Sequence, residues 1–186
     1  YAIESLSYSE AIELSHFGAK VIYTPTLRPV YKKLIPVMIK NSYNPGARGT
    51  LISNKPSNGS KSPIKGISSI DHIDLITLQG PSMVGVSGIS MRLFGSLAKK
   101  NVSIILITQA SSEYSITFAI NPPDSKRAVE AINQEFEREI TFRKELKIIL
   151  EKDLSIIAIV GEKMKNTPGI SAILFRSLGR NGINVI

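Results

Sequence analysis

The chain has 186 residues, of which 42% are hydrophobic and 20% are charged, and its formal net charge is +8. These proportions are ordinary for a globular protein, and no apolar run approaches the roughly 20 residues that span a bilayer, so no membrane partner is expected. With no Cys and only two His, the sequence excludes disulfides, thiol nucleophiles and Cys/His zinc sites. Lys and Arg never run longer than two residues, which argues against a nucleic-acid partner. No signal peptide is visible, so a cytoplasmic location is expected.

Residues 1–52 begin with a helix signal. Ser7 and Glu10 are spaced as a capping box, and Gly18 is placed to end the helix. Three further elements are expected: a short strand at 19–25, a short helix or turn at 27–33, and a strand at 34–40. These elements are too few to close a core of their own, so the segment is interpreted as the tail of a larger domain.

Residues 53–65 are rich in Ser, Pro, Gly, Asn and Lys, which is typical of a linker. A regular pattern follows in residues 66–152. The expected elements are a strand at 73–79, a helix at 88–100, strands at 102–108 and 114–120, a helix capped by Asp124 or Ser125 and running to Ile140, and a strand at 146–152. This order is βαββαβ, the ferredoxin-like split unit, in an α+β fold. Such sheets have edges that invite pairing between chains, so a dimer is expected.

An internal repeat extends this organisation. Residues 88–105 and 169–186 are identical at eight of eighteen positions, and Gly80 and Met83 pair with Gly161 and Met164 in the same register. Residues 153–186 are therefore expected to begin a second, truncated unit, whose last six residues open a strand. The missing initiator Met and the incomplete second copy indicate a fragment of a longer protein.

Two features could bind a small ligand. The loop from Gly80 to Ser90 has three glycines before a helix, and unpaired N–H groups at a helix start attract a carboxylate or phosphate. A plain connection is the alternative, since neither a dinucleotide fingerprint nor a Walker loop is present. Gln109 ends the most apolar strand, where its amide could hold polar ligand groups or bond its own turn. Glu113 is expected to be solvated, and Glu135, Glu137 and Glu139 to face water. No complete catalytic constellation is found.

The motifs of residues 6–52 resemble the end of the kinase domain of aspartokinases. That family's pattern L-S-Y-x-E-A-x-E-L is followed by G-A-K-V-L-H-P-x-T, I-P and N-P-x-x-x-G-T, and this chain has "LSYSEAIEL", "GAKVIYTPT", "IP" and "NPGARGT" in the same order. The remainder resembles the family's regulatory pair of ACT domains. "VSIILITQASSEYSI" looks closest to the bifunctional aspartokinase–homoserine dehydrogenases.

The resemblance implies a parent enzyme that phosphorylates the side-chain carboxylate of aspartate with ATP and Mg, and that uses NADP where a dehydrogenase part is present. Lys20 and Val21 match the family's nucleotide-contacting pair, whereas Tyr23 and Thr24 depart from the usual His and Pro. The family's catalytic residues lie outside this chain, so the fragment alone is expected to be inactive and to hold no cofactor.

The resemblance also implies an effector site for a feedback amino acid and a homodimer formed through the ACT domains. The corresponding residues are Met83, Val84, Gly85, Val86, Ser103, Ile104, Ile105 and Gln109. Gln109 matches a glutamine associated with threonine sensing, and lysine-sensitive relatives tend to carry Asp where this chain has Ile105, so threonine is favoured over lysine. Binding is expected to favour one arrangement of the ACT dimer and to draw the Lys20 segment away from its active geometry.

The domain organisation implied is a kinase remnant at 1–52, a linker at 53–65, a first ACT domain at 66–152 and a truncated second ACT domain at 153–186. The alternatives are a stand-alone ACT-type amino-acid sensor and the regulatory region of a monofunctional, lysine-sensitive aspartokinase. An RNA-binding unit of the same topology is disfavoured because "YSITFAI" lacks the required basic and glycine positions.

Overall fold

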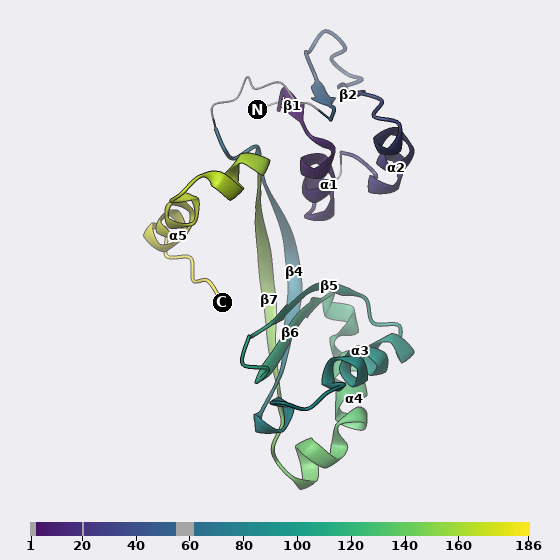
Figure 1. Ribbon diagram of the computed structural model, residues 1–186, viewed down its shortest axis with the longest axis vertical. Coiled ribbons are helices and arrows are strands. Elements are labelled where there is room, and N and C mark those ends of the chain that lie inside the picture. Colours follow the sequence, from purple (N-terminus) through teal and green to yellow (C-terminus); the bar gives the residue numbers. More distant parts are fainter. Residues whose placement is uncertain (1–2, 20, 55–61) are drawn as a thin grey trace. The chain divides into compact units, whose positions relative to one another are not determined.

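The computed structural model describes residues 3–19, 21–54 and 62–186 (Figure 1). It divides into two compact units: Tyr1–Ser69 together with Ile157–Ile186, and Ile70–Ile156. The division falls within the two long strands β4 (Gly66–Gln79) and β7 (Lys147–Val160). Each unit is described by itself below.

The first unit contains a small mixed sheet. Its strand order is β1 (Ser5–Leu6), β3 (Thr50–Ile52), β2 (Val37–Ile39), with β1 parallel and β2 antiparallel to β3. Helices α1 (Tyr8–His16) and α2 (Thr24–Lys32) accompany it. One apolar cluster in this unit consists of buried Leu6, Tyr8, Ala11, Leu14, Leu27, Ile52 and Val160.

The capping box expected at Ser7 and Glu10 is confirmed, but the strand expected at 19–25 is wrong. Val21 and Ile22 lie in a turn, and α2 begins at Thr24. Pro25 explains the difference, because its fixed φ suits the first turn of a helix, where its missing N–H removes no hydrogen bond. The expected strand at 34–40 is shorter, since only Val37–Ile39 pair with β3.

The second unit has the expected ferredoxin-like order and confirms the fold class. Strand β4 is followed by α3 (Ile89–Lys99), β5 (Ile104–Gln109), β6 (Ser115–Ile120), α4 (Ser125–Glu135) and β7, and the sheet order is β5-β6-β4-β7. Strand β6 pairs antiparallel with both β4 and β5. Helices α3 and α4 cover the same face of the sheet (Figure 1). The core between them includes Leu78, Leu93, Phe118, Ile132 and Phe136, all fully buried.

Some expected boundaries in this unit are wrong. Strand β4 begins at Gly66 rather than 73, and β7 continues to Val160, so it joins the last strand of one copy to the first strand of the next. Helix α4 ends at Glu135, and Ile140 lies in a separate π-helix, Arg138–Phe142. Asp124, one of the two expected caps, is the N-cap residue of α4, but its side chain makes no capping hydrogen bond. The Ser125 hydroxyl instead donates to buried Asp74 at 2.5 Å.

The repeat is visible in the backbone. Strands β4 and β7 are both 14 residues long, and Gly66 stands in the same repeat position as Lys147. Left-handed residues recur in the same register: His72 (φ 54) and Asp153 (φ 57), Asn101 (φ 53) and Gly182 (φ 69), Gly88 (φ 88) and Gly169 (φ 86). Helix α5 (Ile170–Arg180) has the same length as α3. The two copies therefore share a local fold.

One repeat-related pair is also a contact. His72 Nδ1 lies 2.9 Å from Asp153 Oδ1, and this hydrogen bond raises the pKa of His72 above its ordinary value of 6.5.

The strand expected after α5 is wrong: residues 181–186 form no strand in the described structure, since no neighbouring strand pairs with them there. The domain limits at 52, 65 and 152 stay predictions, and most of the expected linker, residues 55–61, lies outside the described residues.

Candidate functional site

A cavity of about 370 Å³ lies in the second unit, between the loop that leads into α3 and the turn between β5 and β6. Met83, at the end of a short 3₁₀ helix (Pro81–Met83), is 2% exposed and forms part of its apolar floor. The residues that line it are Met83, Gly85, Val86, Ser87, Gly88, Ile89, Ser90, Gln109, Glu113 and Ile116. Its volume suits a small molecule.

The loop on one side of the cavity is built on glycine. Gly85 has φ 69 and Gly88 has φ 88, a region that residues with a Cβ rarely adopt. Gly88 is the N-cap of α3, and it provides no side chain to bond the N–H groups of the first turn. Those N–H groups and the positive end of the helix dipole favour an anion at this end of the cavity.

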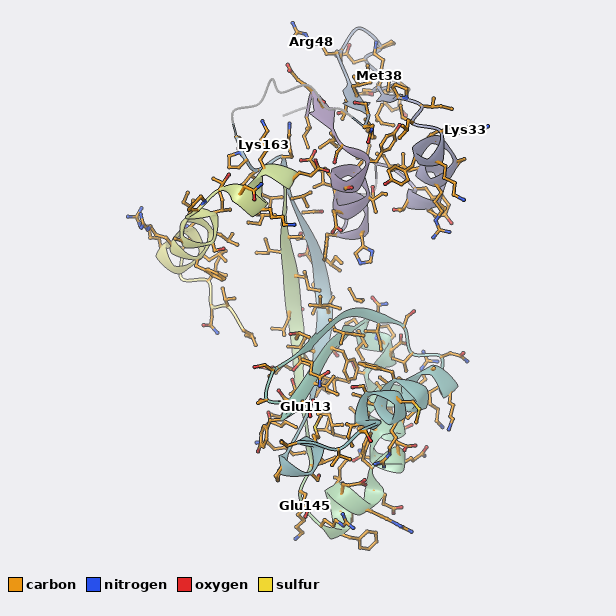
Figure 2. All side chains as sticks on the ribbon, in the orientation of Figure 1. Lys33, Met38, Arg48, Glu113, Glu145 and Lys163 are labelled. Carbon is orange, nitrogen blue, oxygen red and sulfur yellow. The ribbon has the colours of Figure 1, made fainter. Side chains whose placement is uncertain are left out.

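A carboxylate of the chain itself is bound to the loop before α3. Glu113, in the turn between β5 and β6 (labelled in Figure 2), accepts a hydrogen bond from the Gly85 N–H at 3.1 Å. Glu113 has a left-handed backbone, φ 56, in a turn whose Glu113 N–H bonds back to Ala110 O at 3.1 Å. Glu113 is exposed, as expected, but its carboxylate also bonds a backbone N–H of the loop, which the sequence did not predict.

Gln109 faces the same cavity from the last position of β5. Its partner across the sheet is Ile116, which is 1% exposed and also lines the cavity. Among the hydrogen bonds of the described residues, none involves the side-chain amide of Gln109. In this part of the chain, the alternative in which this side chain bonds its own turn is therefore not realised. The amide is available, as both donor and acceptor, to a ligand.

Four of the eight expected effector residues line the cavity: Met83, Gly85, Val86 and Gln109. Val84 is half exposed beside it, and Ser103, Ile104 and Ile105 do not line it. Ile105 lies at a β-bulge, where the register of β5 on β6 skips one residue, and Ile104 packs against the core. Sequence reasoning missed Glu113 and Ile116 as cavity residues. The Ser-rich sequence predicted a turn, but it gave no indication of the direction of the Glu113 carboxylate.

The structure describes only one residue of the expected nucleotide-contacting pair, Lys20 and Val21. Lys20 lies outside the described residues, and Val21, 71% exposed, borders a mostly apolar cavity of about 240 Å³ in the first unit. Across the described ranges, no cluster of three or more acidic or His side chains could hold a metal ion. No helix in that same part of the chain has the length and apolar content needed to cross a bilayer.

Comparison with known proteins identifies this architecture. Residues 76–136, within the second unit, and residues 157–186, within the repeat, match the family model described as an ACT domain. Over 184 residues, 99% of this chain, the sequence is 39% identical to the bifunctional aspartokinase/homoserine dehydrogenase of Haemophilus influenzae, of which it covers 22%. Over nearly its whole length, the chain is therefore similar to one part of the bifunctional aspartokinase/homoserine dehydrogenases. It spans about a fifth of the length of the curated relatives it matches.

Two solved structures of E. coli aspartokinase III resemble this chain as well. The complex with aspartate and ADP, an R-state, is 26% identical with a TM-score of 0.73, covering 95% of this chain and 38% of that one. The complex with lysine and aspartate, a T-state, is 29% identical with a TM-score of 0.63, covering 86% of this chain and 34% of that one. The matched region of an aspartokinase therefore has the same fold as this chain.

Proposed function

We propose that this chain is the regulatory region of an ATP-dependent aspartate kinase that also carries a homoserine dehydrogenase, and that the ACT cavity binds an end-product amino acid. The observation that carries this proposal is the carboxylate of Glu113 on the Gly85 N–H, beside the uncapped start of α3. A site that binds its own carboxylate has the donors to bind the carboxylate of an amino acid.

The ligand carboxylate takes the place of Glu113 on the loop N–H groups. Glu113 is exposed, so its displacement costs little, and its carboxylate remains near enough to pair with the ligand's ammonium group. Gln109 completes the site by bonding the ligand's amino or hydroxyl group. Met83 and Ile116, both almost fully buried, provide apolar contact for the aliphatic part of the ligand.

Threonine fits this cavity better than lysine. Lysine brings two ammonium groups, and Glu113 is the one acidic side chain among the described residues that line the cavity. Ile105, which stands where lysine-sensitive relatives tend to carry Asp, is apolar and lies outside the cavity lining, so this position provides no second carboxylate for an ammonium group. Threonine brings one ammonium group and a hydroxyl, for which the unbonded Gln109 amide is a suitable partner.

The parent enzyme supplies the rest of the chemistry. Residues 1–52 are assigned to the end of the kinase domain, 53–65 to a linker, 66–152 to the first ACT domain and 153–186 to the start of the second. Lys20 and Val21 are the nucleotide-contacting positions. ATP with Mg, and NADP for the dehydrogenase, are bound by other parts of the parent protein, which we place in the cytoplasm. A coupling of about 1–3 kcal/mol between effector and kinase sites would give useful inhibition.

The homodimer is assigned to the edge of the ACT sheet. Strand β5 is one of the two edge strands of this sheet, and Leu106 and Ile107 on it are 39% and 51% exposed. An exposed apolar edge invites pairing with a second chain. Ile107→Lys is expected to weaken the dimer at least tenfold, a cost of about 1.4 kcal/mol, in analytical ultracentrifugation. Met91→Lys, at another exposed apolar residue on α3, is the control, and equal dimer affinities in the two variants would contradict the assignment.

The effector is tested by calorimetric titration of the full-length protein with L-threonine, L-lysine and L-methionine. Threonine is expected to bind, and Gln109→Ala to weaken it about tenfold, since a lost hydrogen bond to a ligand with its partner left unpaired costs on the order of 1–2 kcal/mol. Gln134→Ala makes the same chemical change on the exposed face of α4 and should leave the affinity unchanged.

Two results would contradict the proposal. Wild-type protein that binds none of the three amino acids has no effector site of this kind. Binding of lysine alone, unaffected by Gln109→Ala, would instead show that the monofunctional, lysine-sensitive alternative describes the chain.

A further inference from the structure

The loop that begins the second copy makes an unusual contact in the first unit. A 3₁₀ helix, Glu162–Asn166, follows β7 there, in the position that the cavity-forming loop occupies in the first copy. Glu162 makes two hydrogen bonds to the start of α1: its N–H donates to Glu10 Oε1 at 3.0 Å, and its Oε1 accepts from the Ser7 hydroxyl at 2.6 Å.

These bonds complete a capping box that already uses both partners. Ser7 N–H donates to Glu10 Oε2 at 2.9 Å, and Glu10 N–H donates to Ser7 Oγ at 3.1 Å. An ordinary capping box leaves one carboxylate oxygen and the hydroxyl proton unused. Glu162 takes both. These hydrogen bonds therefore join the loop and the helix start into one closed network.

The network is buried among apolar contacts. Ser7 is 5% exposed and Glu10 is 4% exposed, so a lost partner would leave a buried polar group unpaired. Val160, two residues before Glu162, belongs to the same apolar cluster as Leu6 and Ala11. The backbone of the loop also lies close to residue 63, because a Cβ at Gly161 would come within 2.1 Å of Pro63 O. Buried hydrogen bonds and apolar packing therefore both attach this loop to α1.

The other end of α1 is also attached to a repeat strand. The Ser68 hydroxyl, on β4, donates to Phe17 O at 2.6 Å, at the C-cap of α1. Gly18, with φ 110, lies so close to β4 that a Cβ would come within 2.2 Å of Ser69 O. Helix α1 is therefore held at both ends by the strand and the loop that the repeat contributes to this unit, and Val21 follows five positions after its last residue, His16.

The first copy lacks this contact. Pro81 occupies the repeat position that corresponds to Glu162, and it has neither an N–H nor a polar side chain. The loop after Pro81 instead forms the cavity with Gln109 and Glu113. The two copies of one loop thus differ in chemistry: the first is shaped for a ligand, and the second is shaped to hold α1.

We propose that Glu162 is the positioning residue through which the ACT repeat controls the orientation of α1 and, through it, the Val21 segment. This inference rests on the proposed function, because it assigns the route by which effector binding reaches the kinase part. A change in the strands of the repeat moves the loop after β7, and the buried hydrogen bonds to Ser7 and Glu10 carry that movement to the helix.

The test compares Glu162→Ala, Glu162→Gln and Glu130→Ala in the full-length protein. Glu162→Ala removes the acceptor for Ser7, Glu162→Gln keeps an acceptor oxygen and the backbone N–H, and Glu130→Ala is a matched control at an exposed Glu on α4. Threonine affinity is measured by calorimetry, and inhibition by kinase assay at saturating threonine. We expect Glu162→Ala to leave the affinity within about twofold but to lose most of the inhibition, with Glu162→Gln and Glu130→Ala close to wild type.

A second measurement does not depend on threonine. Hydrogen exchange of the first-turn amides of α1 should speed up about fivefold in Glu162→Ala, and more in Ser7→Ala, which also removes the capping bond to the Glu10 N–H. The double variant should exchange no faster than Ser7→Ala, because the bond between the two side chains is already lost there. Additive effects, or inhibition by threonine that survives Glu162→Ala, would overturn the proposal. If the wild type binds no amino acid, the proposed function fails, and the exchange data alone decide whether Glu162 holds α1.

Discussion

Gly80→Ala is expected to destabilise the ACT domain by about 3 kcal/mol or more, because overpacking against a rigid backbone is relieved only by moving it. Gly80 joins β4 to the loop that forms the cavity. A Cβ at this position would lie 1.9 Å from Glu145 O, the carbonyl of a residue just before β7 (labelled in Figure 2). The Gly80 segment cannot move freely, since the Gly80 N–H also donates to Tyr114 O at 3.0 Å.

Gly95→Ala is the matched control within the same unit. Gly95 lies inside α3, and apart from the helix's own backbone no heavy atom of the described residues is within 4 Å of the Cβ it would gain. Replacing a helical glycine by alanine should stabilise the domain by about 0.5–1 kcal/mol. Urea denaturation followed by circular dichroism measures both variants. A Gly80→Ala protein as stable as wild type would show that the close approach to Glu145 is absent in solution.

Arg92→Ala is the second substitution with a large expected effect. Arg92, on α3, places its guanidinium between two carboxylates of the opposite segment, 2.8 Å from Glu135 and 2.8 Å from Glu139. It also donates to Glu135 O at 2.9 Å, at the last residue of α4, and lies 4.3 Å from the centre of the Phe136 ring. One side chain therefore joins α3, the end of α4 and the π-helix, and the expectation that Glu135 and Glu139 simply face water is wrong.

The loss on Arg92→Ala should be about 2 kcal/mol, the value for a charge-assisted hydrogen bond network reduced by its partial exposure to solvent. Arg92→Lys should recover only part of it, because an ammonium group cannot bond two carboxylates and a carbonyl in one plane. Arg138→Ala removes an exposed arginine from the π-helix and serves as control. Equal stability of Arg92→Ala and Arg138→Ala in urea denaturation would contradict the assigned role.

The same contact predicts a dependence on pH. Hydrogen bonds from Arg92 lower the pKa of the Glu139 carboxyl below its ordinary value of 4.5. A carboxyl with a lowered pKa in the folded state stabilises that state above the unfolded pKa, and the contribution disappears as pH falls through the folded pKa. Wild-type protein should therefore lose more unfolding free energy than Arg92→Ala between about pH 5 and pH 3. Parallel curves would show that Glu139 is not paired in solution.

Local patterns in the sequence predicted local structure well. The α3 helix, strands β5 and β6 and the capping box of α1 follow from apolar spacing and from residues three positions apart, and all are confirmed. The pattern failed at residues 19–25, where β-branched and aromatic residues suggested a strand. A helix begins there at Thr24 instead, with Pro25 in its first turn, and no strand in the described part of the chain pairs with Val21 and Ile22.

Contacts between distant residues could not be predicted in the same way. Glu113 reaches Gly85 across 28 positions, Arg92 reaches Glu139 across 47, and Glu162 reaches Ser7 across 155. Each of these polar side chains would be interpreted as solvated in its own segment, because composition and periodicity describe neighbours along the chain. Only the fold decides which of them meet.

The amino-acid sequence by itself determined the βαββαβ order, the repeat and its constant register, the glycine-rich loop before α3 and the kinship with aspartokinases, because periodicity, turn chemistry and motif order are carried by residues close together in the chain. The tertiary structure decided that four of the expected effector residues line one cavity with a carboxylate already bound in it. It also decided that the second copy of the loop holds α1, because pairing of buried polar groups depends on which segments the fold brings together.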